Sequence, residues 1–205
     1  MKLSSKFVSA GLTQNKPQGE DMNVMKSMLL AVAAIVAIGS TARAEKTVEV
    51  GGAAMYPTKD IIDNAANSKD HTTLVAAVKA AGLVDTLKGA GPFTVFAPTN
   101  EAFAKLPAGT VETLLKPENK GTLSSILTYH VVSGKMDSKS IAAAIKAGKG
   151  KAMMKTVQGG ELTASMKGKD LILTDEKGGM SKVTIANVYQ KNGVIHVVDT
   201  VLMPK

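Results

Sequence analysis

The spacing of apolar residues changes along this chain from a helical to a strand-like rhythm. Between residues 72 and 147, apolar side chains recur three or four positions apart, as at Leu74, Val78 and Ala81, which is typical of short helices with one buried face. From residue 155 onward, short apolar runs are separated by glycine-rich turns. Because helices and strands are segregated more than alternated, the sequence predicts an α+β fold, in which helices decorate an antiparallel sheet or sandwich.

Glycine, proline and asparagine residues set the expected boundaries of these elements. Gly82 is a natural stop for the first helix, and Asn192-Gly193 is a strong hairpin signal before the last strand. Residues 93–97 show little polarity on either face and precede Pro98, which indicates a strand buried on both sides. The expected helices cover residues 72–82, 100–105, 110–115, 122–130 and 138–147. The other expected strands cover residues 155–157, 162–166, 171–174, 183–188 and 194–203.

The N-terminal region has the three parts of a cleaved signal peptide. A basic start at Lys26 leads into an apolar run over residues 28–38, and the small-residue triplet Ala42-Arg43-Ala44 follows. This run of eleven residues is too short to span a bilayer. The sequence therefore predicts a leader at residues 1–44, cleaved before Glu45, and an exported protein that is periplasmic or extracellular.

Residues 1–21 are polar and precede a signal that is already complete from Met25. Either the true start lies at Met22 or Met25 rather than Met1, or the leader has a long polar beginning. After cleavage, we expect a short N-terminal segment at residues 45–55 and one domain at residues 56–204. The chain has no cysteine, so we expect neither a disulfide framework nor a lipid anchor at the cleavage site, and no membrane span after cleavage.

The charge of the mature chain argues against nucleic-acid binding. Residues 45–205 hold 20 lysines and 15 acidic residues, a net charge of +5, and neither arginine nor tryptophan. Nucleic-acid readers rely on arginine forks and exposed aromatic rings, so the lysines are interpreted mainly as a solubilising surface. Lys146, Lys149, Lys151 and Lys155 form one dense stretch; it fits a solvated loop better than a site for an anionic polysaccharide or head group.

Three segments of the chain are similar to the signature blocks of fasciclin domains. Residues 93–103 resemble the first block, residues 126–132 the tyrosine-histidine segment, and residues 193–202 the second block. The order and length of these blocks resemble the single-domain secreted bacterial members of that family, the mycobacterial major secreted antigens among them. The resemblance implies a wedge-shaped β-sandwich of about seven strands with several short helices packed on it, and a role in adhesion or surface recognition.

The histidine of the central block lies on an apolar helical stripe. Leu123, Ile126, Leu127 and His130 fall at positions i, i+3, i+4 and i+7, so the imidazole is expected to be buried, neutral and hydrogen-bonded. Thr94, Thr99 and Asn100 are suitable partners for it. The alternative, a ligand-binding or proton-transfer role, has no carboxylate or second histidine placed to assist it. By the alternation of its strand, His196 is expected to be a second interior polar group.

The resemblance also suggests partner-binding residues. Tyr129 lies one step off the helical stripe, so we expect a partly buried ring with its hydroxyl near the surface, and the Tyr129-His130 pair is associated with adhesion in the family. Adhesion members of the family often carry an aspartate-isoleucine pair, associated with integrin contact, where this chain has Asn187 and Val188. Without the carboxylate, we expect a partner other than an animal integrin.

Catalytic and cofactor motifs are absent from the sequence. There is no nucleophile elbow, phosphate-binding loop, dinucleotide fingerprint or zinc-protease motif. His71, His130 and His196 lack metal-ligand spacing, and the adjacent Met153-Met154 pair suits core filling better than a soft-metal site. We therefore expect no enzyme activity, no metal and no cofactor.

Two functions fit these observations. The first is a monomeric, non-enzymatic adhesion or recognition module that binds a cell-surface protein, matrix component or polysaccharide. The alternative is a carrier that binds a small hydrophobic ligand between sheet and helices, which requires a concave apolar cavity.

Overall fold

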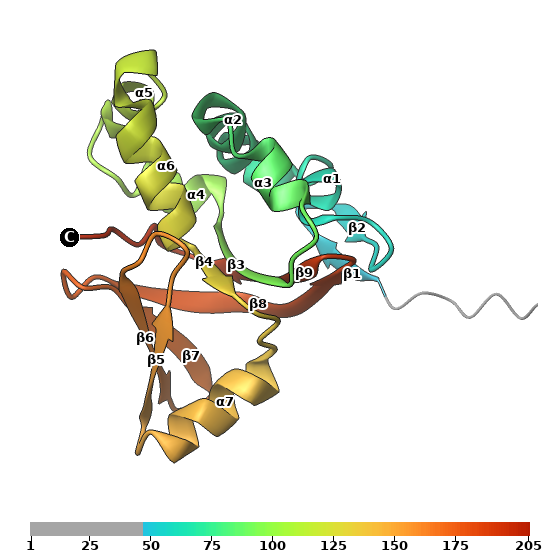
Figure 1. The fold of residues 1–205 in the computed structure, drawn as a ribbon, viewed down its shortest axis with the longest axis vertical. Coiled ribbons are helices and arrows are strands. Elements are labelled where there is room, and N and C mark those ends of the chain that lie inside the picture. Colours follow the sequence, from blue (N-terminus) through green and yellow to red (C-terminus); the bar gives the residue numbers. More distant parts are fainter. Residues whose placement is uncertain (1–46) are drawn as a thin grey trace, which may run out of the picture. The chain divides into compact units, whose positions relative to one another are not determined.

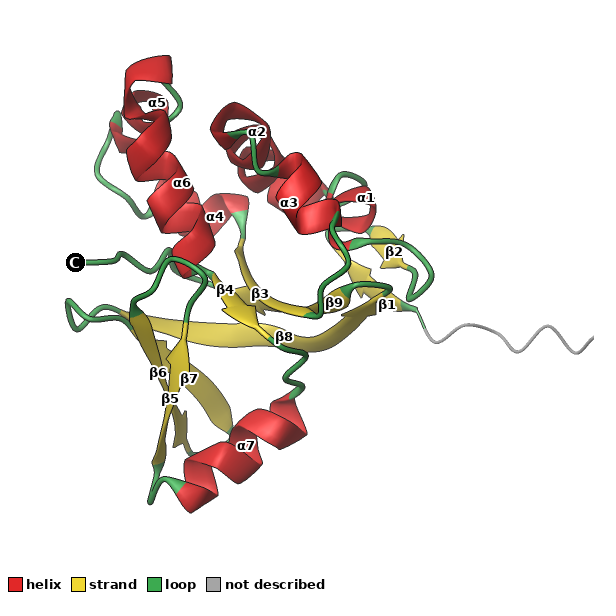
Figure 2. Cartoon of the chain, in the orientation of Figure 1, coloured by secondary structure: helices red, strands yellow, loops and turns green. Residues whose placement is uncertain are grey.

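The structure, a computed structural model, describes residues 47–205, and the predicted leader at residues 1–44 lies outside the described residues. Most helices precede residue 130 and most strands follow it. Figure 2 shows the helices (red) and the strands (yellow) of the domain. The predicted α+β class is therefore confirmed. Among residues 47–205, no helix is both long and apolar enough to cross a membrane.

The helices are short, and side chains at their ends fix their boundaries. Asp60, Thr99 and Asp137 each accept a hydrogen bond from the backbone N–H three residues further on, the N-cap interaction that satisfies a free helical donor. Gly82 ends the first long helix in the left-handed conformation, with φ 72°, as predicted. The helices are α1 (Ile61–Ala65), α2 (Thr72–Ala81), α3 (Val84–Lys88), α4 (Asn100–Ala104), α5 (Thr110–Leu114), α6 (Lys120–Tyr129) and α7 (Ser138–Ala147), with 3-10 turns η1 (Lys69–His71) and η2 (Pro117–Asn119).

The strands form one seven-stranded sheet and a separate hairpin (Figure 1). The order in the large sheet is β4-β3-β9-β8-β7-β6-β5, and every neighbouring pair is antiparallel except β3 with β9. The strands are β1 (Val48–Val50), β2 (Ala53–Met55), β3 (Phe93–Pro98), β4 (Val131–Ser133), β5 (Lys151–Lys155), β6 (Glu161–Lys167), β7 (Asp170–Thr174), β8 (Met180–Gln190) and β9 (Gly193–Val198). The expectation of about seven sheet strands with helices packed on them is confirmed.

Strands β3 and β9 are buried on both faces, because a different apolar cluster packs on each. Val95 and Ile195 face a cluster shared with α1, α2 and α6, whereas Phe96 and Val198 face a second cluster shared with α7 and strands β5 to β7. Successive side chains of a strand point to opposite faces. The predicted burial of residues 93–97 on both faces is therefore confirmed, and strand β3 lies between the two apolar clusters of the domain.

The strand expected at residues 155–157 is placed wrongly. The structure has β5 at Lys151–Lys155, with Ala152 and Met154 buried and the lysines exposed. Met153 hides this alternation in the sequence, because an apolar residue occupies a solvent-facing position of a strand with a single buried face. Part of the stretch interpreted as a solvated loop is therefore a strand. The last strand also ends earlier than expected, at Val198.

The hairpin between β8 and β9 lies where the sequence predicts it, but its two turn residues are Lys191 and Asn192. The buried Asn192 side chain makes two hydrogen bonds to backbone groups. Its Oδ1 accepts from the Ile61 N–H at 3.1 Å, and its Nδ2 donates to the Leu87 carbonyl at 2.7 Å. Gly193 is already paired with Phe93 in the parallel ladder. A Cβ atom at Gly193 would lie 2.2 Å from the Phe93 carbonyl oxygen, so this position requires glycine for close backbone approach.

The two edges of the sheet meet at a narrow seam. Strands β4 and β5 are the outermost strands, and a single bridge pairs Val132 with Thr156. Next to it, the Val157 N–H donates to the Val131 carbonyl at 2.7 Å. The sheet is thus nearly closed on itself.

Gly193→Ala is expected to lower the free energy of unfolding by about 2–3 kcal/mol, because the new methyl group forces the β3 and β9 backbones apart. Gly121→Ala is the matched control. Gly121 lies in α6 with nothing within 4 Å of an added Cβ, so alanine there should leave stability unchanged or raise it by up to about 1 kcal/mol. Urea unfolding measures both, and equal stability of the two variants would contradict the close approach.

Candidate functional site

His130 is a buried clamp between the end of α6 and the C-terminal segment. Its Nδ1 donates to the Ile126 carbonyl at 2.8 Å, and its Nε2 accepts from the Leu202 N–H at 3.0 Å. These two bonds require a neutral ring with its proton on Nδ1. Burial also lowers the pKa of His130 below its ordinary value, which keeps the ring neutral. The ring therefore holds together two backbone segments that lie 72 positions apart in sequence.

Tyr129 is fully buried and ties α6 to two turns of the sheet. Its hydroxyl donates to the Glu161 carbonyl at 2.7 Å and accepts from the Glu176 N–H at 3.2 Å. Burial is the largest cause that raises the pKa of Tyr129 to about 12. The expectation of a partly buried ring is therefore wrong: the ring packs into the second apolar cluster with Phe96 and Leu162, and the hydroxyl reaches the turns at Glu161 and Glu176.

The burial of both side chains corrects their expected role in direct partner contact. His130 is 2 % exposed and Tyr129 is 0 % exposed, so neither offers a surface to another molecule. Their bonds instead fix the positions of surface turns. Asp175 completes the same arrangement, because its carboxylate accepts from the Gly179 N–H at 2.7 Å and the Met203 N–H at 2.9 Å. Sequence reasoning missed Asp175, although an aspartate just before Gly178-Gly179 is a turn signal.

Thr94 and His196 hold the loop that leads into α7. The Thr94 hydroxyl donates to the Gly134 carbonyl at 2.6 Å and accepts from the Met136 N–H at 2.8 Å. His196 Nε2 donates to the Met136 carbonyl at 2.9 Å, and its ring stacks on Phe96 with centroids 5.7 Å apart. Both polar residues are fully buried, and burial lowers the pKa of His196. They come from the two paired central strands, so the sheet determines where this loop lies.

Thr99 and Asn100 are not partners of His130. They are half-buried: Thr99 caps α4, accepting from the Ala102 N–H at 3.2 Å, and the Asn100 Oδ1 accepts from the Thr73 N–H at 3.0 Å. The expected joint polar core of Thr94, Thr99, Asn100 and His130 is therefore not formed. Each of these residues stabilises a different local segment.

Asn187 and Val188 sit at an irregularity in β8. The β8–β9 register shifts between Ile185 and Val188, and Asn187 has φ 63°, a left-handed conformation that asparagine tolerates better than most residues. Its amide bonds Ser138 twice, accepting from the backbone N–H and donating to the hydroxyl, each at 2.8 Å. Val188 is 1 % exposed and belongs to the core, so the expected contact of a partner with Val188 is wrong, whereas half-buried Asn187 anchors the start of α7.

A small polar surface lies directly outside these anchors. Tyr189 is 39 % exposed, its hydroxyl donates to Asp137 Oδ2 at 3.3 Å, and Lys135 Nζ lies 5.2 Å from the centre of its ring. We call Lys135, Asp137, Asn187 and Tyr189 the Tyr189 surface. An exposed aromatic ring held by a cation and a carboxylate is suited to contact with another molecule. Sequence reasoning reached this surface only through Asn187.

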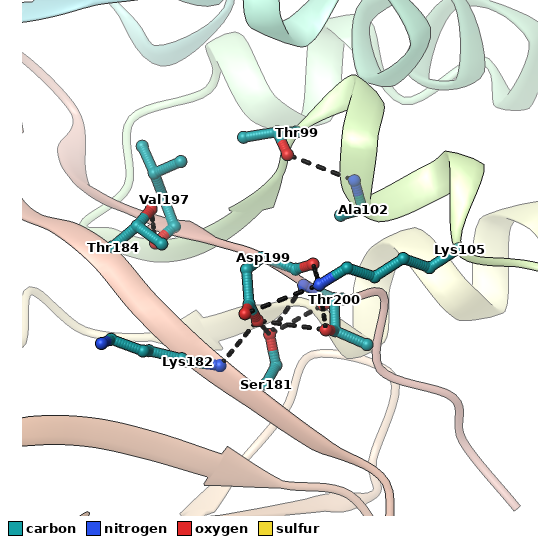
Figure 3. Close-up of polar contacts among 9 residues, drawn as sticks. All are labelled: Thr99, Ala102, Lys105, Ser181, Lys182, Thr184, Val197, Asp199 and Thr200. Atoms are coloured by element: carbon teal, nitrogen blue, oxygen red, sulfur yellow. Dashed lines mark hydrogen bonds and ion pairs between the residues drawn. The ribbon is translucent and has the colours of Figure 1, made fainter.

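A second polar cluster surrounds Asp199 at the end of β9 (Figure 3). Its Oδ1 accepts from the Lys182 N–H at 2.9 Å and the Thr200 hydroxyl at 3.0 Å, and its Oδ2 lies 3.6 Å from Lys105 Nζ. Partial burial by itself raises the pKa of Asp199, but hydrogen bonds from Lys182, Thr200 and Ser181 and the charge of Lys105 together lower it. Asp199 thus connects β8, the end of β9 and the end of α4 through hydrogen bonds and one ion pair.

Neither a metal-binding cluster nor a ligand-sized interior cavity is present among the described residues. In residues 47–205, no three histidine, aspartate or glutamate side chains are grouped to hold a metal ion. His71 is buried beside Ser68, whose hydroxyl lies 2.9 Å from its Nδ1, far in sequence from His130 and His196. The apolar interior between α1, α2, α6 and the sheet leaves a cavity of about 30 Å³, far smaller than the site of a small-molecule ligand.

Comparisons with known proteins converge on one family. The model described as the fasciclin domain matches residues 69–204. The chain is 47% identical to protein sll1483 of Synechocystis over 171 residues, which are 82% of this chain and 87% of that relative. It is 37% identical to the cell surface glycolipoprotein MPB83 of Mycobacterium bovis over 160 residues, 76% of this chain and 64% of that one.

Among solved structures, a FAS1 domain pair from the insect cell adhesion molecule Fasciclin I matches with a TM-score of 0.64 and 17% identity. The match covers 72% of this chain and 52% of that one. At this identity the likeness establishes the fold alone.

His130→Ala is expected to lower the free energy of unfolding by about 1–3 kcal/mol, because the variant leaves a cavity and strands the Leu202 N–H and the Ile126 carbonyl. Urea unfolding followed by circular dichroism gives the midpoint and slope. His130→Asn retains a donor near the Ile126 carbonyl and should recover part of the loss. A His130→Ala variant with unchanged midpoint and slope would show that the clamp contributes nothing.

Stability is expected to fall as the pH drops below about 6.5, because burial lowers the pKa of His71, His130 and His196 in the folded protein. Near pH 6.5 the histidines of the unfolded chain take up protons that the folded chain does not bind. Proton uptake therefore favours the unfolded chain below that pH, whereas the free energy of unfolding keeps its full value above it. Each histidine contributes a slope of up to about 1.4 kcal/mol per pH unit. Urea unfolding at pH 7.5, 6.0 and 5.0 measures the change, and a flat profile would mean that the folded rings titrate normally.

Proposed function

Because the chain belongs to the fasciclin domain family, we propose that it is an exported, non-enzymatic recognition module that attaches its cell to a surface protein or polysaccharide. One relative supports this role by name, the cell surface glycolipoprotein MPB83. The leader predicted at residues 1–44 supports export. The module acts as a monomer and does not bind nucleic acid.

The proposal is carried by the hydrogen bonds that the buried polar residues make. Tyr129, His130, Thr94 and His196 all bond to backbone groups, so they stabilise turns rather than perform chemistry. Among them, Thr94 and His196 hold the loop before α7, which carries Lys135 and Asp137 of the exposed Tyr189 surface. A rigid surface loses little conformational entropy when a partner binds.

The interior argues against the carrier alternative. Its apolar cavities measure about 30, 20 and 10 Å³, whereas sites for small hydrophobic ligands require about 300 Å³ or more. The large apolar residues already fill the space between helices and sheet.

Tyr189→Ala is expected to weaken attachment about tenfold, the loss typical of removing a central aromatic contact. The assay counts attached cells of a deletion strain complemented with each variant. Tyr56→Ala is the matched control, since Tyr56 is 40 % exposed and also carries a lysine over its ring, at 5.1 Å. It should attach like the wild type.

Normal attachment of the deletion strain would overturn the adhesion function. Loss of attachment in the deletion strain, with full rescue by the folded Tyr189→Ala variant, would instead show that the contact lies elsewhere on the domain.

A further inference from the structure

Charge is divided unequally between the two halves of the domain. Residues 47–133 hold 7 lysines and 8 acidic residues, whereas residues 134–205 hold 12 lysines and 6 acidic residues. The first half is therefore close to neutral and the second carries a net charge of about +6. The second half contains α7 and strands β5 to β9, so the positive potential of the protein arises on this part of the fold.

A groove of about 600 Å³ lies within this basic half. Its walls come from the first turns of α7, the end of the β6–β7 hairpin and the irregular part of β8. Ser138 and Ala186 line the groove. Asn187 is hydrogen-bonded to Ser138 and directly follows Ala186 in the sequence. The groove therefore begins beside the Tyr189 surface.

The groove combines cations with apolar and hydroxyl groups. Lys139, Lys169 and Lys182 line it together with Asp170. Lys182 pairs with Asp170 at 2.8 Å, while Lys139 and Lys169 form no ion pair within residues 47–205. Met166 and Thr184 supply an exposed apolar surface and a hydroxyl. Two cations thus remain available to an anionic ligand.

We propose that this groove binds an acidic polysaccharide, with Lys139 and Lys169 contacting successive carboxylate or sulfate groups. The inference rests on the proposed function and names the class of its partner. Sugar chains present C–H faces and hydroxyls between their anionic groups, which match the apolar and hydroxyl groups between the lysines.

Other polyanions fit the groove less well. A protein interface of ordinary size draws its binding energy from tryptophan, tyrosine and arginine, and none of these residues lines the groove. Single-stranded nucleic acid requires aromatic platforms, which the groove also lacks. A membrane surface would be met by cations on a flat or convex face with apolar groups that insert, whereas these lysines surround a concave one.

The test compares two triple variants that remove the same charge. Lys139→Gln/Lys169→Gln/Lys182→Gln alters the groove, and Lys79→Gln/Lys116→Gln/Lys120→Gln alters exposed lysines of α2 and the α5–α6 region. Binding to immobilised polygalacturonate and heparin is measured at 50 and 150 mM NaCl, with dextran as the neutral polymer and vesicles containing phosphatidylglycerol as the lipid surface. The groove variant should bind at least about tenfold more weakly to an acidic polymer, and the control less than about twofold, since only the groove charges make contact.

Three results would overturn the proposal: no binding of the wild type to either acidic polymer, an equal loss in both variants, or groove-dependent binding to vesicles alone. The single variant Lys169→Gln, at an exposed hairpin position, guards against misfolding of the triple variant and should itself weaken binding. If the groove variant loses polysaccharide binding yet supports normal attachment, the groove is not the adhesive site. Attachment by the deletion strain tests the proposed function independently.

Discussion

The in-register parallel pairing of β3 with β9 is the interaction on which the rest of the structure depends. It joins residues about one hundred positions apart, and it places an apolar cluster on each face of the same two strands. Close contact at Gly193 and the buried amide of Asn192 fix where the pairing begins. Since both clusters share these strands, the helices and the outer strands are positioned through them, and the ordering cost of the long connection is offset by burial on two sides.

Buried polar side chains provide a second level of order in a chain without cysteine. Tyr129, His130 and Asp175 connect helix, turns and C-terminal segment, and Thr94 and His196 connect the central strands to the loop before α7. Each bonds to backbone groups, which cost free energy when they are buried without a partner. Tyr129 and His130, which the resemblance associates with adhesion, are therefore buried residues that hold backbone segments in place.

Patterns that depend on neighbours in sequence were predictable, and those that depend on distant partners were not. The stop at Gly82, the exact span of α7 and the two-sided burial of β3 follow from local residues. The helix was expected to end at His130, one residue too late: α6 ends at Tyr129, and Val131 begins β4. The partners of His130 were missed because Leu202 lies at the other end of the chain. Nothing local distinguishes Asn187 from an ordinary strand residue, since its left-handed backbone arises from the register shift against β9.

The seam between β4 and β5 has a consequence for how copies of this protein behave at high concentration. An open sheet of this size would present two free edges, and free edges pair with those of neighbouring molecules. Here one edge strand is only three residues long, a bridge closes it against the other, and Lys151 and Lys155 flank the exposed part of β5. The geometry that closes the sheet thus also limits edge-to-edge aggregation, a safeguard that matters for a domain whose chain contains no disulfide to hold it closed.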